Sequence, residues 1–209
     1  MESFALERIY RFTDIIIRTA YINILVIIFS LLGLILFGFF PAIIAAFSIF
    51  RKWLTGYSDI AITKNFWRIY KREFIRGNLV GFIVVLIGGL LYINMSIAEV
   101  IQHDAIRLTY YPLLAVNILF LGMLIYLLPM YVHFDMKVIE LFKNAFLCMF
   151  AMPLLTIILV VTVVLLYLLF TVIPGLLPFF GFSLFILVMM KGALISFERM
   201  LHFSEMARE

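Results

Sequence analysis

Residues 19–50 read TAYINILVIIFSLLGLILFGFFPAIIAAFSIF and contain no charged side chain over 32 positions. An uncharged apolar run of this length indicates a protein that is integral to a membrane. As one helix the run would extend ~48 Å, which exceeds the ~30 Å hydrocarbon core of a bilayer. It is therefore too long for one straight span and too short for two ordinary ones, and the way the chain resolves this mismatch decides the fold.

The composition of the whole chain supports a membrane protein. Of its 209 residues, 66% are hydrophobic and 13% are charged, and the mean hydropathy is +1.19. A soluble domain is about half apolar and about a quarter charged. We therefore expect one membrane domain, residues 1–209, in a lipid bilayer. The net charge of +4 does not indicate nucleic acid as a partner, because the basic residues flank apolar segments, where membrane topology and anionic headgroups explain them.

Apolar segments recur along the chain at lengths that suit membrane-spanning helices. We expect an all-α fold, a polytopic transmembrane helix bundle with five spans and a short re-entrant or half-helix after the first span. The predicted spans are residues 19–37, 78–98, 110–132, 145–170 and 177–197, and the short return arm is 41–50.

The distribution of Lys and Arg predicts which connecting segments are cytoplasmic. Residues 51–77 contain seven basic side chains, whereas 99–109 contain one and 171–176 contain none. Cytoplasmic loops of membrane proteins carry an excess of Lys and Arg. The pattern therefore predicts that 51–77, 133–144 and the C-terminal tail are cytoplasmic and that the other two loops are outside.

The N-terminus leaves two topologies open. If residues 19–50 form one long tilted helix, the N-terminal segment and its three arginines lie outside, against the charge rule. If the helix breaks at Gly38 and Pro41, residues 41–50 can return as a half-helix and the N-terminus is cytoplasmic. Glycine permits bending, and proline disfavours helix at the preceding residue.

Residues 60–76, IAITKNFWRIYKREFIR, predict a cytoplasmic amphipathic helix. Its apolar side chains share one face, and basic side chains occupy much of the rest. The helix is either a solvated anchor for topology or a docking surface for a partner. Trp, Tyr and Arg are the residue types that dominate binding hot spots. The tentative contact residues for a partner or lipid are Trp67, Arg68, Tyr70, Lys71 and Arg72.

No motif for catalysis or for a cofactor is present. The sequence lacks a nucleophile elbow, a phosphate-binding loop and a glycine-rich dinucleotide motif. His103–Asp104, His133 and Asp135 do not have the spacing of a zinc site. Cys148 is the single cysteine, so an internal disulfide is excluded. We therefore expect no catalytic, metal or cofactor site and a protein that is not an enzyme.

Three segments carry a resemblance to a known family. They are PAIIAAFSIFRKW at 41–53, NFWRIYKREFIRGN at 65–78 and YLLPMYVHFDMKVIELFKNAF at 126–146. In this order they resemble the YesL-like family of bacterial membrane proteins, whose biochemical function is unknown. The resemblance implies genes that lie beside carbohydrate ABC importers, and hence an accessory role in sugar uptake or in its regulation.

The leading hypothesis is a non-enzymatic protein of the bacterial cytoplasmic membrane, with both termini cytoplasmic. It would be an accessory or regulatory component that contacts ABC transporter membrane subunits or another membrane protein. The alternative is a small solute transporter whose path surrounds the broken first hairpin. A membrane enzyme is the third possibility, and the near absence of ionisable residues from the spans argues against it.

Overall fold

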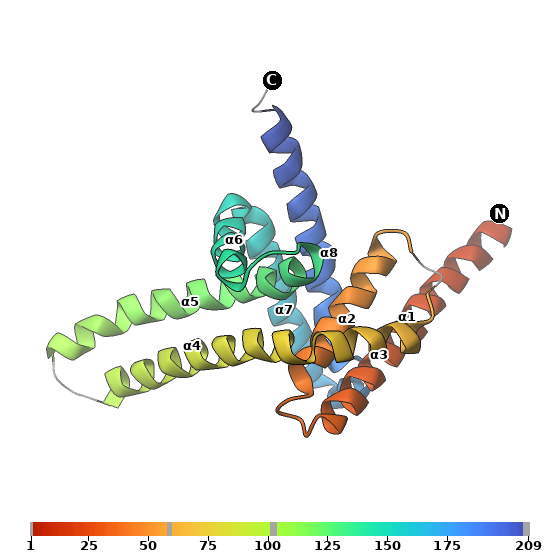
Figure 1. The fold of residues 1–209 in the computed structure, drawn as a ribbon. Helices are drawn as coiled ribbons and strands as arrows, with labels where there is room; N and C mark the ends of the chain where they lie inside the picture. The colour runs from red at the N-terminus through yellow and green to blue at the C-terminus, as the bar shows by residue number, and fades with distance from the viewer. Residues whose placement is uncertain (1, 58–59, 101–103, 207–209) are drawn as a thin grey trace. The chain divides into compact units, whose positions relative to one another are not determined.

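The computed structural model consists of helices joined by short connections (Figure 1). It describes residues 2–57, 60–100 and 104–206, and the side chains of 13–57, 60–98 and 109–202. No strand occurs in these ranges, and the predicted all-α fold is confirmed. The helices are α1 (Glu2–Leu32), α2 (Phe39–Leu54), α3 (Ile62–Arg72), α4 (Phe74–Val100), α5 (Asp104–His133), α6 (Val138–Ala151), α7 (Pro153–Val172) and α8 (Leu177–Met206), with a short 3-10 helix, η1 (Pro174–Leu176), before α8.

Five helical segments of the described residues are long and apolar enough to cross a membrane, as predicted. The chain is thus a multi-pass membrane protein with a lipid bilayer around it. The segments are Thr13–Leu32, Phe74–Ala98, Thr109–His133, Pro153–Val172 and Pro174–His202.

The segment predicted as the fourth span, residues 145–170, is divided in the structure. Helix α6 ends at Ala151, and α7 begins at Pro153. Proline lacks a backbone N–H and is tolerated in the first turn of a helix, where that group has no partner within the helix. Pro153 therefore starts a new helix, and the apolar segment long enough to span is shifted to Pro153–Val172.

The helix predicted for residues 60–76 is also divided. Helix α3 ends at Arg72, and Glu73 has φ −90° and ψ 4°, outside the helical range. The Glu73 N–H donates to the carbonyl of Ile69 at 2.9 Å, and α4 begins at the next residue. Part of the basic segment, including Arg76, therefore belongs to α4.

The chain divides into two compact units, which we describe separately. Unit 1 consists of Met1–Phe74 and Val161–Lys191, and unit 2 consists of Ile75–Val160 and Gly192–Glu209. Helices α7 and α8 contribute residues to both units. The expectation of one domain over residues 1–209 stays a prediction.

Helix α2 is the centre of unit 1. Ten consecutive residues, Pro41–Phe50, are buried. A helix that is apolar on every side buries all of its faces. The small side chains of Ala42, Ala45 and Ala46 are fully buried, and small residues let neighbouring helices approach closely. Both α1 and α3 pack against α2.

A buried tyrosine joins three helices in unit 2. Tyr126 of α5 is fully buried, and its hydroxyl lies 3.0 Å from the Thr156 hydroxyl on α7 and 3.5 Å from the Ser196 hydroxyl on α8. These bonds satisfy the phenol in an otherwise apolar core. Gly192 of α8 leaves room for Leu159, because a Cβ at that position would collide with the leucine side chain.

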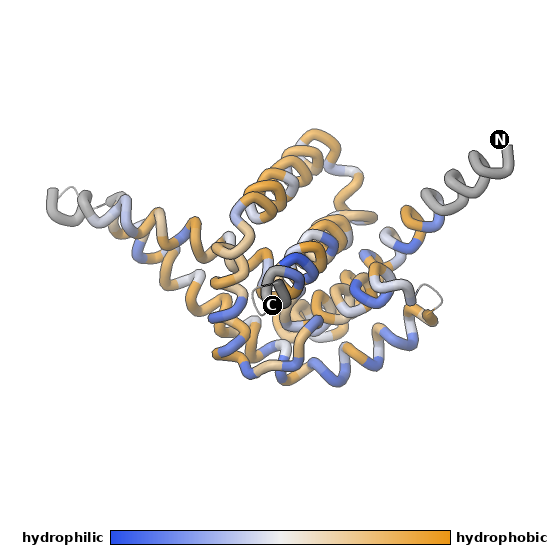
Figure 2. The backbone as a smooth tube through the Cα atoms, turned by 90° about the horizontal axis from the view of Figure 1, so that it is seen from above, coloured by the Kyte–Doolittle hydropathy of each residue, from blue (hydrophilic) through white to orange (hydrophobic). Residues whose placement is uncertain are grey.

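Large parts of the helices expose apolar side chains. In the most apolar windows of α4 and α7, only 11% of the residues are buried, and hydrophobic residues dominate the backbone trace (Figure 2). Lipid is the solvent that such surfaces require. Tyr92 and Tyr111 are exposed near the ends of α4 and α5, as is typical of the aromatic belts at membrane–water boundaries.

Candidate functional site

The long uncharged run turns back at residues 33–38, between α1 and α2. Two glycines of this turn, Gly33 and Gly38, are packed backbone against backbone. A Cβ on Gly33 would lie 2.5 Å from the Gly38 nitrogen and 2.7 Å from the Tyr70 hydroxyl. A Cβ on Gly38 would lie 2.5 Å from the Ser30 carbonyl oxygen. Both positions therefore require glycine, because any side chain would push the two backbones apart.

The two residues predicted to break the helix, Gly38 and Pro41, lie at the end of this turn. Gly38 immediately precedes α2, with φ −88° and ψ −27°. Pro41 is the third residue of α2 and is buried. Because a proline in the first turn costs no hydrogen bond within the helix, Pro41 helps to start α2, and residues 33–38 make the reversal.

The tip of the turn exposes four consecutive large apolar side chains, residues 34–37, and Leu34 is 82% exposed. Leu34 and Ile35 have φ angles of 55° and 62°, a left-handed conformation that is rare for such side chains. The Ile35 N–H donates to the Ser30 carbonyl at 2.8 Å, which holds this conformation at the end of α1. The turn therefore presents an apolar tip that suits contact with lipid.

Helix α3 packs on the hairpin through its apolar face. Phe66, Ile69 and Tyr70 are buried, as their helical spacing predicts. The ring of Phe29 on α1 lies 5.0 Å from the ring of Phe66 and 5.1 Å from that of Tyr70. The apolar face of α3 is thus covered by the hairpin.

The two ends of α3 show its direction along α1. Near its start, the Thr63 hydroxyl is hydrogen-bonded to the Tyr21 hydroxyl. Near its end, Tyr70 lies beside Gly33. Helix α3 therefore runs beside α1 toward the turn. The basic helix and the helix break, which are separate in the sequence, lie next to each other in the structure.

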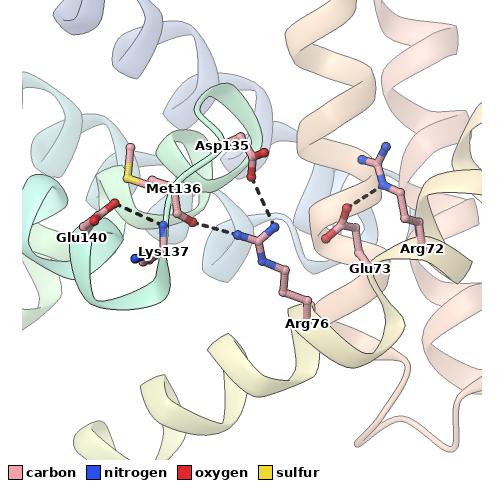
Figure 3. Close-up of polar contacts among 7 residues, drawn as sticks. All are labelled: Arg72, Glu73, Arg76, Asp135, Met136, Lys137 and Glu140. Atoms are coloured by element: carbon pink, nitrogen blue, oxygen red, sulfur yellow. Dashed lines mark hydrogen bonds and ion pairs between the residues drawn. The ribbon is translucent and has the colours of Figure 1, made fainter.

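The outward side of α3 carries the other predicted contact residues. Trp67, Arg68, Lys71 and Arg72 are exposed, and we call them the α3 face. The Lys71 ammonium lies 4.3 Å from the centroid of the Trp67 ring, a cation–π geometry. Arg72 Nε lies 2.8 Å from the Glu73 carboxylate (Figure 3). Tyr70, predicted as a contact residue, instead points inward and is only 5% exposed, because its ring fills the space beside Phe29.

Basic and aromatic side chains meet at the open end of the hairpin. Arg18 Nε lies 2.8 Å from Asp14, and the Arg18 guanidinium lies 5.7 Å from the centroid of the Trp53 ring on α2. Burial, and secondarily repulsion by Arg72, lowers the pKa of Arg51. At neutral pH the arginine remains charged, so this end of α2 carries partly desolvated positive charge.

An asparagine in the uncharged run bridges α1 and α8 within unit 1. Asn23 is fully buried. Its Nδ2 donates to the Pro178 carbonyl at 2.7 Å, and its Oδ1 accepts the N–H groups of Phe182 at 2.9 Å and Ser183 at 3.1 Å. From the sequence alone, Asn23 is a polar residue within an apolar segment. Its partners could not be predicted, because they are backbone groups more than 150 positions away.

The His, Cys, Asp and Glu side chains that the structure describes lie apart from one another. No three His, Cys, Asp or Glu side chains among them converge. The ring of His133 packs against Phe134 and Phe197, at centroid distances of 4.5 Å and 5.3 Å. The side chains of His103 and Asp104 lie outside the described residues.

The sequence of this chain is similar to a family model and to three proteins of one bacterium. The family model described as "Protein of unknown function, DUF624" matches residues 19–95. In Bacillus subtilis (strain 168), "Uncharacterized protein YteU" is 36% identical over 180 residues, which cover 86% of this chain and 81% of the relative. "Uncharacterized protein YesV" is 33% identical over 204 residues, 95% and 96% of the two chains. "Uncharacterized protein YesL" is 32% identical over 136 residues, 65% and 64% of the two chains. No solved structure matches this chain.

Proposed function

The chain belongs to the YesL-like, or DUF624, family of membrane proteins, and from this premise we propose that it is a non-enzymatic accessory or regulatory component of a carbohydrate ABC uptake system. The family resemblance supports the carbohydrate part of the proposal. The distribution of Lys and Arg supports a cytoplasmic membrane location with both termini cytoplasmic. The α3 face supports the contact with a partner.

The observation that carries the proposal is the division of α3 into a buried and an exposed side. The hairpin covers Phe66, Ile69 and Tyr70, so the outward Arg68, Lys71 and Arg72 are not part of this apolar packing. The Trp67 ring is partly exposed and lies 5.5 Å from the Phe29 ring. Trp67 stacks on Tyr70 at 6.0 Å with an interplanar angle of 12°. A tryptophan already held in place loses little side-chain freedom on binding, and Trp and Arg are enriched among binding hot spots.

Charge reversal on the α3 face tests this proposal in the native bacterium. The double variant Arg68→Glu, Lys71→Glu is expected to lose co-purification of ABC transporter membrane subunits while its helical content and thermal stability stay unchanged. Lys64→Glu is the control, because Lys64 is an exposed cation on the same helix, outside the α3 face. Unchanged recovery of the ABC subunits with the double variant would contradict the proposal.

A second candidate function is transport by the chain itself. The observation that favours it is the interruption of the α1–α2 hairpin together with the Asn23 bridge to the start of α8. Many transporters build their substrate sites from discontinuous helices. Flux of a sugar into liposomes that contain only this chain, abolished by Asn23→Leu, would favour transport over the accessory role.

A further inference from the structure

Unit 2 contains an apolar pocket that the proposed function does not use. It has a volume of about 360 Å³, within the ~300–1,000 Å³ range of small-molecule sites. Its walls come from the end of α5, the connector to α6, α6 itself and the last part of α8. We call it the methionine pocket, and its principal lining residues are Met130, Phe134, Met136, Leu147, Phe197 and Met200.

The connector that forms one wall is held by Arg76 of α4 (Figure 3). Arg76 Nη2 donates to the Met136 carbonyl at 2.8 Å, and Nη1 lies 3.4 Å from the Asp135 carboxylate. The Lys137 N–H also donates to the Glu140 carboxylate at 3.4 Å. Arg76 therefore contacts the backbone of Met136, a lining residue of the pocket, and Lys137 is the next residue along the chain.

Exposed apolar side chains adjoin the pocket in the same unit. Leu147 and Leu201 line the pocket and are about half exposed. Phe146 and Phe150 on the same helix are also exposed. Because apolar surface continues from the pocket onto the exposed side of α6, a bilayer that covers α6 also reaches the mouth of the pocket.

The size of the pocket limits its occupant. Its volume equals that of a cube of about 7 Å, whereas an α-helix with side chains is ~10–12 Å across. A helix of a partner therefore does not fit inside, but part of a flexible acyl chain does. Methionine side chains are adaptable and fill irregular apolar space, which suits a chain without fixed shape.

The cations beside the pocket favour an anionic headgroup. The Arg76 side chain is 49% exposed, and its partner Asp135 is 96% exposed. An ion pair in such an exposed position contributes little, so a phosphate can replace the carboxylate at low cost. Lys137 is exposed as well. Basic pockets at the cytoplasmic ends of spans attract anionic lipids, and this connector carries the charge pattern of a cytoplasmic segment.

We propose that the methionine pocket binds one acyl chain of an anionic phospholipid whose headgroup phosphate binds Arg76 and Lys137. The site would hold a lipid in a defined place, distinct from the lipids that cover α4 and α7. It is independent of the α3 face, so it can fail or succeed without bearing on the proposed partner contact.

Native mass spectrometry of the full chain in neutral detergent tests the headgroup. The chain is titrated with phosphatidylglycerol and, separately, with phosphatidylcholine of the same acyl chains. We expect one phosphatidylglycerol to be retained in preference to phosphatidylcholine, and Lys137→Gln to weaken this retention about fivefold, the effect of one basic residue near an anionic headgroup. Lys64→Gln on α3 is the charge-matched control. Equal retention of the two lipids, or no effect of Lys137→Gln, would overturn the proposal.

The acyl chain is tested by filling the pocket and by labelling it. Met136→Trp is expected to abolish retention of the lipid, whereas Leu165→Trp on the exposed side of α7 retains it. In wild-type protein, phosphatidylglycerol with a photoreactive acyl chain should label residues 130–147 and 197–201 above the level reached with photoreactive phosphatidylcholine. Equal labelling by both lipids overturns the proposal without any variant. A dimer that Met136→Trp abolishes while lipid retention persists would instead assign the pocket to a second copy of the chain.

Discussion

The side-chain oxygen of Asn23 on α1 accepts the backbone N–H of Phe182 on α8 at 2.9 Å, while its nitrogen donates to the Pro178 carbonyl at 2.7 Å. In an α-helix the N–H of Phe182 and the carbonyl of Pro178 are the natural partners of each other. The Asn23 side chain on α1 therefore bonds to both members of one backbone N–H and carbonyl pair of α8. Backbone groups at membrane depth need such partners, because lipid offers none.

Replacing Asn23 by Leu should destabilise the protein. The variant removes the hydrogen bonds to the backbone of Pro178, Phe182 and Ser183 and is expected to cost about 1–3 kcal/mol, the usual cost of leaving buried polar groups unsatisfied. Asn94→Leu is the matched control, since Asn94 is exposed and its amide donates to the Leu90 carbonyl within the same helix. Thermal unfolding in detergent measures the difference, and equal stability of the two variants would contradict the bridging role.

Replacing glycine by alanine should have different effects on stability in the turn and in a helix. Gly38→Ala is expected to lower the melting temperature strongly, because its Cβ would lie 2.5 Å from the Ser30 carbonyl oxygen. Gly89→Ala on α4 meets nothing within 4 Å and should be neutral or stabilising by up to ~1 kcal/mol, since alanine favours helix. Similar melting temperatures for both variants would show that the two backbones do not pack as described.

Two aromatic residues of α3 should behave differently when they are removed. Tyr70→Ala deletes a buried ring and is expected to destabilise the protein by ~3–5 kcal/mol, as for other large aromatic residues. Trp67→Ala removes a partly exposed ring and should destabilise the protein clearly less than Tyr70→Ala does, while weakening partner recovery. Thermal unfolding and co-purification are measured on the same preparations. A loss of stability for Trp67→Ala equal to that for Tyr70→Ala would show that Trp67 is a packing residue.

Labelling of introduced cysteines tests the topology. With Cys148 replaced by Ser, Ser3→Cys and Tyr57→Cys should react with an impermeant maleimide only after permeabilisation, and Asp104→Cys should react from outside. The expectation follows from the seven basic residues in 51–77 against one in 99–109. Labelling of Ser3→Cys in intact cells would refute the hairpin topology and favour an N-terminus outside.

Helix α3 shows which features of this structure helical periodicity can predict. The spacing of Phe66, Ile69 and Tyr70 correctly predicted the buried side of α3, because a helical period places them on one face whatever covers it. The same spacing could not tell that Phe29 covers it, since that contact joins distant parts of the chain. Tyr70 was therefore placed among the contact residues by residue type, and burial removes it from the α3 face.

The sequence by itself determined the multi-pass membrane character, the number of segments long enough to span and the family, because these depend on local hydropathy and on shared motifs. Only the tertiary structure decided where the chain reverses between α1 and α2 and that α3 runs beside α1 to that turn. It also decided that Asn23 is hydrogen-bonded to the backbone of α8. The physical reason is that close backbone approach and long-range hydrogen bonds join residues far apart in sequence. In the sequence, a glycine or asparagine with such contacts cannot be told from one without them.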